Sequence, residues 1–305
     1  MAYLHEERVE FTDSVNLAAD RRGILPAVVE KDYYVTVILH LLAEKLPFVV
    51  FKGGTSLSKC HKAIMRFSED IDITVDTKLS QGQMGILKKT IEKIADELGL
   101  TIQNLNETRS RRSYNKYIVE YPSVGSIQAE EIPPTVILET SLAEISFPTI
   151  MLPVHSYLGD MLEDESPDLC RKYMLDPFEM KVQGIDRTLI DKVFAICDYY
   201  LKGEVKRHSR HIYDIYKLLP IVPQTQGFRQ LISDVRHERS ANQKLCPSAQ
   251  PGVDVSELLK KLIEEDVYKK DYDTITERIL EEDIPYETAL ESIRRIADSG
   301  LFELE

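Results

Sequence analysis

One stretch of the chain, residues 48–76, constrains the fold more than any other part of the sequence. It reads as an apolar strand from Phe48 to Phe51, a tight turn of paired glycines, and a polar helix start. A second strand follows, because side chains alternate along a strand and here acidic residues alternate with apolar ones. This alternation places Asp70 and Asp72 side by side on one face, with Ile71 and Ile73 directed toward a core.

The chemistry of this stretch depends on the two neighbouring carboxylates. Asp70 and Asp72 repel each other and are costly to leave unpaired. Mg2+, which prefers hard oxygen ligands, would remove that cost. The alternative is a charged edge strand with solvated carboxylates, and Asp76 fits better as a strand-end carboxylate. A glycine turn open to phosphate, followed about sixteen residues later by a carboxylate pair, indicates nucleotidyl transfer.

The same residues carry a family resemblance. GGTSLSK at 53–59 followed by RFSEDIDI at 66–73 resembles the AbiEii/AbiGii-type nucleotidyltransferase toxins of the polymerase-beta-like superfamily. The resemblance implies an α+β fold, in which a mixed twisted sheet flanked by helices precedes a helical C-terminal domain. Further segments agree in order, so that the resemblance covers roughly residues 28–220: VVEKDYYVTVIL at 28–39, LIDKVFAI at 189–196 and RHIYDIYKL at 210–218.

Periodicity along the chain predicts helices first and strands afterwards. Helical spacing occurs at 7–22, 28–46 and 80–100, and strand patterns at 101–105, 114–122 and 135–142. The proline-interrupted segment 145–162 reads as an irregular exit, and from about 163 onward the pattern is helical. We therefore predict a nucleotidyltransferase α/β domain at 1–160 and a helical domain at 161–305, with surface loops at 224–228 and 246–254.

Composition describes an ordinary globular protein, with 43% apolar and 29% charged residues. No apolar run is long enough to cross a bilayer, and MAYLHEERVEF lacks the order of a secretory signal. The four cysteines lie far apart without a CxxC pair, so we expect reduced thiols, a cytoplasmic location and no zinc site.

The net charge of −13 argues against general nucleic-acid binding, but it allows a local basic patch to grip one RNA end. Acidic residues concentrate after residue 253. Basic residues form two clusters where we expect phosphate contacts, although each could instead be a solvated loop. The clusters are Arg109, Arg111, Arg112 and Lys116, and Lys202, Lys206, Arg207 and Arg210.

The glycine turn and the helix that follows are the predicted nucleotide-binding segment. Backbone N–H groups and hydroxyls there would hold the triphosphate, and Lys59 could reach a phosphate one turn later. The alternatives are an ordinary helix N-cap and a solvated lysine. The predicted contacts come from Gly53, Gly54, Thr55, Ser56, Ser58 and Lys59.

A third metal-binding carboxylate normally completes such a site from a neighbouring strand. Glu139 is the best candidate because it is the single acid in the otherwise apolar VILETSL. In the resembled superfamily this position helps to bind the metal and can draw the proton from the attacking hydroxyl. Glu120 and Glu144 are the alternatives.

Two residues of the helical half enter through the resemblance. Lys192 lies at the edge of an apolar stripe, where it could snorkel over the core or contact the phosphates. Helical spacing places Asp214 on a polar face, where a surface pair with Arg210 is the alternative to a functional role. The resemblance implies that this aspartate is required and lies near the functional lysine, and it extends to Arg210 and His211.

Together these features predict a Mg2+-dependent nucleotidyltransferase, with Mn2+ as an alternative ion. The expected catalytic residues are Asp70, Asp72, Glu139, Lys192 and Asp214. The resemblance further implies a bacterial toxin that adds nucleotides from an NTP to the 3′ end of tRNA, paired with a winged-helix antitoxin. The alternatives are transfer to a protein hydroxyl or to a small molecule such as an aminoglycoside, and a non-catalytic module that binds RNA or a partner.

Overall fold

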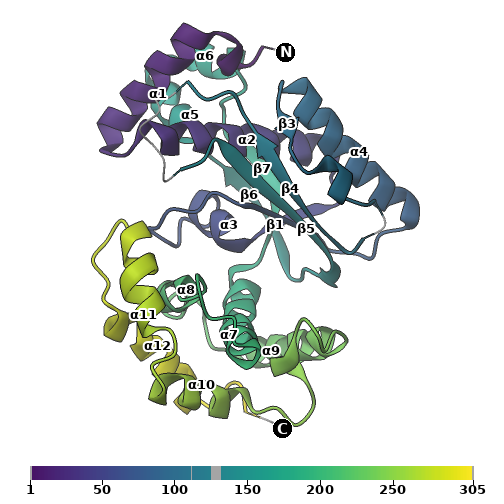
Figure 1. Cartoon of the computed structure of the whole chain (residues 1–305), viewed down its shortest axis with the longest axis vertical. Helices are drawn as coiled ribbons and strands as arrows, with labels where there is room; N and C mark the ends of the chain where they lie inside the picture. Colours follow the sequence, from purple (N-terminus) through teal and green to yellow (C-terminus); the bar gives the residue numbers. More distant parts are fainter. Residues whose placement is uncertain (1, 111, 125–131, 304–305) are drawn as a thin grey trace. The chain divides into compact units, whose positions relative to one another are not determined.

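The computed structural model describes residues 2–110, 112–124 and 132–303 of the chain. Contacts divide it into two compact units (Figure 1). The first unit contains Met1–Cys60 and Ser68–Val182, and the second contains His61–Phe67 and Gln183–Glu305. This division falls at residue 182, later than the boundary at 160 that the sequence predicts.

Within the described residues, the first unit is built on one seven-stranded mixed sheet. β1 pairs antiparallel with β2 and parallel with β7, β2 pairs parallel with β5, and β3, β4 and β5 pair antiparallel in succession. The predicted α+β fold class is therefore confirmed. The strands, in the order β3-β4-β5-β2-β1-β7-β6, are Thr101–Ile102, Tyr114–Glu120, Thr135–Ile145, Ile71–Val75, Val49–Lys52, Phe178–Gln183 and Thr149–Val154.

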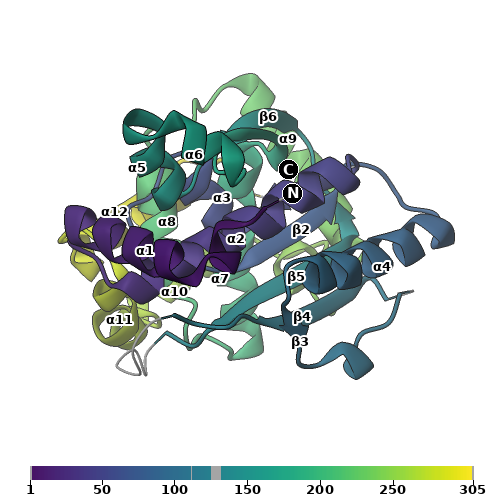
Figure 2. The same cartoon turned by 90° about the horizontal axis from the view of Figure 1, so that it is seen from above.

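Helices of the first unit cover one face of this sheet. In the view from above, α2 lies across the strands with α4 beside it, and α1 packs against α2 (Figure 2). The helices predicted at 7–22, 28–46 and 80–100 are confirmed, with small differences at their ends. The bounds are α1 (Arg8–Arg22), α2 (Pro26–Lys45), α3 (Gly53–Lys59), α4 (Gln81–Glu97), α5 (Tyr157–Glu165) and α6 (Pro167–Lys172).

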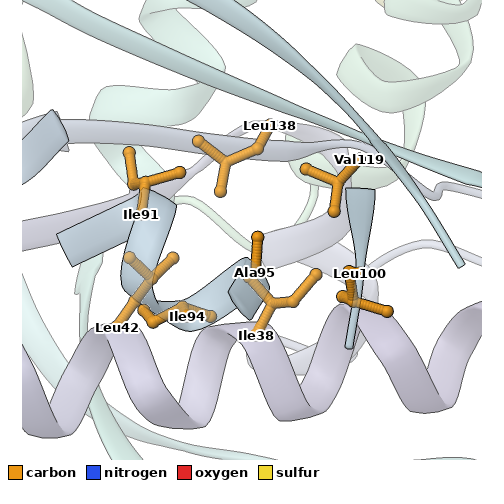
Figure 3. A pocket seen from close by; sticks show the side chains of 8 residues that line it. All are labelled: Ile38, Leu42, Ile91, Ile94, Ala95, Leu100, Val119 and Leu138. Carbon is orange, nitrogen blue, oxygen red and sulfur yellow. The ribbon is translucent and has the colours of Figure 1, made fainter. Parts of the chain in front are cut away.

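The apolar face of the sheet packs against α2 and α4. Val119 and Leu138 point from the strands toward Ile91 and Ile94 of α4, above Ile38 of α2 (Figure 3). The cavity left between these side chains measures about 10 Å3. Because its lining is apolar and it barely admits one water, it is a packing void and not a ligand site.

Two strands lie where the sequence predicts none. Segment 145–162, expected to be irregular, contains β6 and the start of α5, and β7 lies in the half that was expected to be helical. Pro148 directly before β6 and Pro153 within it obscure the strand pattern, and β6 tolerates Pro153 because it is an edge strand. In β7 the alternation of Phe178, Met180 and Val182 with charged residues is a usable signal, but the strand is six residues long and pairs with a distant part of the chain.

The second unit is helical, as predicted. Its core includes the inward faces of α10 and α12, so the acidic C-terminal segment completes this core. Its loop prediction at 224–228 is wrong in part, because Thr225 caps a helix that begins at Gln226. The helices are α7 (Ile185–Lys202), α8 (Arg210–Leu218), α9 (Gln226–Ser240), α10 (Val255–Glu264), α11 (Lys269–Asp271) and α12 (Tyr286–Asp298).

The short segment His61–Phe67 belongs to this helical unit through backbone hydrogen bonds. The Phe67 N–H donates to the Ile279 carbonyl, and the Glu281 N–H donates to the Met65 carbonyl, each at 2.9 Å. Cys60, Cys170, Cys197 and Cys246 are buried and free. A search of the described helices for one that could traverse a bilayer finds none.

Candidate active site

The glycine turn lies against the carboxylate of Asp72. Gly53 has a φ of +79°, and a Cβ added there would lie 1.9 Å from Asp72 Oδ2. Glycine is therefore required at this position, both for its backbone conformation and for the space that the carboxylate occupies. The structure thus places Gly53 directly against the first carboxylate of β2, and the predicted contact of the turn with a phosphate remains a prediction.

Four charged residues lie directly opposite one another across four strands. Lys52 pairs with Asp72, Asp72 with Glu139, and Glu139 with Lys116. We call Lys52, Asp72, Glu139 and Lys116 the cross-strand row. Directly paired residues share a face of a sheet, and strands lie roughly 4.8 Å apart, so two acids and two bases form one polar line. Lys116 Nζ lies 3.9 Å from Glu139 Oε1.

Asp70 directly precedes β2, two residues before Asp72, and is half-buried. Its position before the strand agrees with the predicted alternation, in which Ile71 and Ile73 are fully buried. Glu120, an alternative third acid, lies opposite Thr135 and not beside Asp72. The register therefore favours Glu139 as the neighbour of the carboxylate pair.

The two acidic residues of this row, Asp72 and Glu139, have the oxygen atoms that Mg2+ prefers as ligands. They are carboxylate oxygens on adjacent strands, and two such carboxylates can reach one ion across a strand pair. In the side-chain positions of the described residues, no three His, Cys, Asp or Glu side chains converge as a ready ligand set. Asp70, Asp72 and Glu139 have the oxygen donors that a metal needs, and register makes Asp72 and Glu139 neighbours. Their role as ligands remains a prediction.

The hydroxyl groups that follow the turn make local hydrogen bonds. Thr55 Oγ1 lies 2.9 Å from Ser68 Oγ, and the Ser56 and Ser58 hydroxyls donate to the carbonyls of Gly53 and Thr55. The contact between Thr55 and Ser68 joins α3 to the segment that leads into β2. These bonds fix the geometry of the turn, and the predicted phosphate contacts are not tested by them.

Lys59 is not a solvated lysine, so that alternative prediction is wrong. The residue is 8% exposed, and its ammonium donates to Asp32 Oδ1 at 2.5 Å, Thr36 Oγ1 at 2.8 Å and the His155 carbonyl at 3.0 Å. All three donors of the ammonium have acceptors within the first unit. Contact with a phosphate would require Lys59 to leave these partners.

In the second unit, Asp214 is the centre of a buried ionic cluster, which corrects its predicted position on a polar helix face. Asp214 is fully buried and accepts a bidentate pair of hydrogen bonds from Arg66, at 2.7 and 2.9 Å. Lys192 Nζ lies 2.7 Å from Asp214 Oδ2, and His211 Nδ1 lies 3.4 Å from the same ammonium. We call Arg66, Lys192, His211 and Asp214 the Asp214 cluster.

Burial and charge oppose each other in this cluster. Burial alone would raise the pKa of Asp214, but the guanidinium of Arg66 and the ammonium of Lys192 hold that pKa well below its usual range. Burial and the neighbouring Lys192 lower the pKa of His211 to about 3. At neutral pH the aspartate is therefore ionised and the imidazole is neutral.

The alternatives predicted for Asp214 and for Lys192 are both wrong. A surface pair between Arg210 and Asp214 does not form, because Asp214 has no exposed surface and pairs with Arg66 and Lys192. Lys192 is 6% exposed and its ammonium is paired with Asp214, so it does not snorkel to solvent. The predicted proximity of Lys192 and Asp214 is confirmed. Arg66 was missed as their partner, although it stands in the RFSED lead-in that carries the resemblance.

The basic residues predicted to contact RNA lie on exposed segments. Arg109, Arg112 and Lys116 are exposed near the start of β4, and Arg111 lies outside the described residues. In the other cluster Lys206 and Arg207 are exposed, while Lys202 and Arg210 are partly buried. Lys116 belongs to the cross-strand row, which places positive charge directly beside Glu139.

Comparison with known protein families shows to which family the chain belongs. Residues 39–294 match the family model described as nucleotidyl transferase AbiEii toxin, type IV TA system. The chain belongs to this family. The AbiEii match covers the cross-strand row and the Asp214 cluster, and it makes this protein a nucleotidyltransferase toxin of a type IV toxin–antitoxin system.

A solved structure supports the fold of this AbiEii protein. The chain is similar to MenT4, a nucleotidyltransferase toxin from Mycobacterium tuberculosis H37Rv, with a TM-score of 0.54 and 15% sequence identity. The similarity covers 95% of this chain and 90% of MenT4. At this identity it shows the fold alone. No curated protein sequence is significantly similar to the chain.

Proposed function

We propose that this AbiEii toxin is a Mg2+-dependent enzyme that transfers nucleotides from an NTP to the 3′ end of tRNA. The observation that carries the proposal is the cross-strand row, in which Asp72 and Glu139 are direct neighbours on parallel strands. Asp70 precedes Asp72 by two residues, and the backbone of Gly53 lies against the Asp72 carboxylate. A nucleotide bound at the glycine turn would thus have its phosphates beside two or three carboxylates.

In this mechanism the acceptor hydroxyl attacks the α-phosphate and pyrophosphate leaves. Asp70, Asp72 and Glu139 would hold Mg2+, which when bound lowers the pKa of the hydroxyl and neutralises charge on the leaving group. The Glu139 carboxylate, whose side chain is 31% exposed, can accept the proton of the hydroxyl. The backbone of the glycine turn orients the outer phosphates. The chain contributes chiefly by positioning charge.

The Asp214 cluster supplies the remaining part of the proposal. Lys192 is the group that we assign to offsetting phosphate charge, and Asp214 orients its ammonium at 2.7 Å. Lys59 has three internal acceptors, and we therefore assign it to holding α3 in place and not to binding phosphate.

A nucleic-acid acceptor agrees with the position of the basic residues. Although the chain carries a net charge of −13, Lys116 stands in the cross-strand row, and Arg109 and Arg112 are exposed close to it in sequence. Such a local concentration of positive charge favours a polyanion over a neutral small molecule. The choice of tRNA rests on the family resemblance, as does the pairing with a winged-helix antitoxin.

The test incubates the purified protein with each of the four labelled NTPs, Mg2+ and total RNA. We expect label in the tRNA fraction, lost in Asp70→Asn and Asp72→Asn. Asp76→Asn is the matched control, because Asp76 follows the same strand but pairs with Lys181 at 2.6 Å. Asp70→Ala should also abolish growth inhibition in cells.

Other results would redirect the proposal. Label in protein or in a small hydroxylated compound, and not in RNA, would replace tRNA as the acceptor. RNA binding without any transfer would indicate a non-catalytic module. Transfer that persists in Asp72→Asn would remove the carboxylates from the mechanism.

A further inference from the structure

Two consecutive charged residues of α2, Lys31 and Asp32, expose little of their side chains to solvent. Lys31 is 2% exposed, and the side chain of Asp32 is 10% exposed. A buried charge is expensive unless it is paired, and an apolar residue of similar volume would often be as stable. α2 already buries many apolar side chains, including Tyr33, Tyr34 and Leu39. Packing of the helix therefore does not explain why these two charges are present.

Lys31 pairs with the segment that leads into the carboxylate strand. Its ammonium donates to Oε2 of Glu69, the residue immediately before Asp70. The preceding residue of the same segment, Ser68, contacts Thr55 of α3 through its hydroxyl. The backbone that delivers Asp70 and Asp72 is thus attached at two consecutive residues.

Asp32 holds the other half of the candidate site. Its Oδ1 accepts from Lys59 at the end of α3, and its Oδ2 accepts from the backbone N–H of Tyr157 at 2.9 Å. α3 begins at Gly53, so this bond holds the end of the short helix whose first two residues are the paired glycines. One rigid helix therefore contacts both the segment before Asp70 and the helix after Gly53.

We propose that Lys31 and Asp32 are positioning residues for nucleotidyl transfer, which set the distance between the glycine turn and the carboxylates of β2. The inference rests on the proposed function of this site. Neither residue needs to touch the nucleotide: Lys31 acts through Glu69, and Asp32 acts through Lys59. A shift of about 1 Å in a reacting group can cost on the order of a hundredfold in rate, which is the reason for a rigid attachment.

The decisive test concerns Lys31, because Glu69 is 32% exposed and water can solvate it when its partner is removed. We compare Lys31→Met, Glu69→Gln and the double variant, and Lys31→Arg as the conservative change. Lys181→Met is the matched control, because it removes an ion pair to Asp76 at the opposite end of β2. For the second attachment, Asp32→Asn with Lys59→Met removes both charges together.

Two readouts are measured: turnover with separate kcat and KM, and Mn2+ affinity by electron paramagnetic resonance with each of the four non-hydrolysable NTPs. We expect Lys31→Met and Glu69→Gln each to lose tenfold to a hundredfold, on the order seen for outer contacts of metal sites, in kcat and in Mn2+ affinity. The double variant should lose no more than either single one. Lys31→Arg should recover most of the loss, and Lys181→Met should lose little. The paired Asp32 and Lys59 variant should lower kcat similarly.

The proposal would be overturned if the losses in the double variant were additive. It would also be overturned if Glu69→Gln kept wild-type kcat and Mn2+ affinity while Lys31→Met lost them, because Lys31 would then act directly and not through Glu69. Wild-type values in Lys31→Met would overturn it as well. If Asp72→Asn leaves Mn2+ and NTP binding unchanged, the proposed function itself is contradicted, and the positioning role with it. If Asp72→Asn abolishes binding while Lys31→Met does not weaken it, only the positioning role fails.

Discussion

Replacing Gly53 with alanine tests the arrangement of turn and carboxylate most directly. A Cβ at this position would lie 1.9 Å from Oδ2, 2.8 Å from Cγ and 3.1 Å from Cβ of Asp72. Real Cβ contacts essentially never fall below 3.0 Å, so the carboxylate has to move by about 1 Å or leave its rotamer. Because Cγ is also too close, rotation of the terminal oxygens alone does not relieve the clash.

Gly99 provides a matched control for the backbone. Its φ is +65°, and a Cβ added there meets nothing within 4 Å. Both Gly53→Ala and Gly99→Ala therefore carry the left-handed penalty of about 1–2 kcal/mol. Only Gly53→Ala also displaces Asp72, and a displacement of this size is expected to lower turnover on the order of a hundredfold.

The assay combines nucleotidyl transfer with urea unfolding followed by circular dichroism. We expect both variants to unfold at lower urea than the wild type, while Gly99→Ala keeps its activity and Gly53→Ala loses it. Wild-type turnover in a folded Gly53→Ala protein would refute the reasoning, since the carboxylate would then tolerate displacement. Equal losses of activity in both variants would show that lowered stability, and not the position of Asp72, is responsible.

The Asp214 cluster yields three further expectations. Asp214→Asn leaves the buried cations of Arg66 and Lys192 without their counter-charge, which costs about 3–5 kcal/mol; an unchanged urea midpoint would contradict this. Lys192→Met retains the bidentate pair between Arg66 and Asp214, so the fold should persist while growth inhibition is lost, and a variant that still inhibits growth would exclude Lys192 from the chemistry. His211 has a pKa lowered to about 3 by burial and Lys192, against an unfolded value of about 6.5. The unfolded state therefore binds the proton first as the pH falls, so His211 removes up to about 1.4 kcal/mol of stability per pH unit below 6.5. The urea midpoint of His211→Asn should fall less steeply between pH 6.5 and 5 than that of the wild type, and equal slopes would show that His211 does not titrate in this way.

Local patterns in the sequence were sufficient for the parts of the fold that local rules control. The alternation of Asp70 to Val75 predicted β2 and the buried isoleucines. The paired glycines and the polar residues after them predicted a helix start, although α3 begins at Gly53 and so includes both glycines of the expected turn. Periodicity and the resemblance predicted a helical second half, which the structure confirms. Each of these depends on neighbours within a few residues, where side-chain direction follows from backbone period.

The sequence failed where a distant partner reverses the local preference. Helical spacing placed Asp214 on a polar face, yet Arg66, from a segment almost 150 residues earlier, allows its burial. Lys59 looked like a surface lysine until Asp32 and the His155 carbonyl appeared as its acceptors. β7 was missed because its pairing with β1 is non-local.

The sequence by itself therefore determined which groups are present: a glycine turn, an acidic pair two residues apart, and a candidate third acid at Glu139. Only the tertiary structure decided which of them meet. Strand register set Glu139 opposite Asp72, and the fold brought counter-charges to Lys59 and Asp214. The physical reason is that a charged side chain can be buried only where a counter-charge pairs with it. When that counter-charge is far away in the sequence, the local pattern of residues around the buried charge does not reveal it.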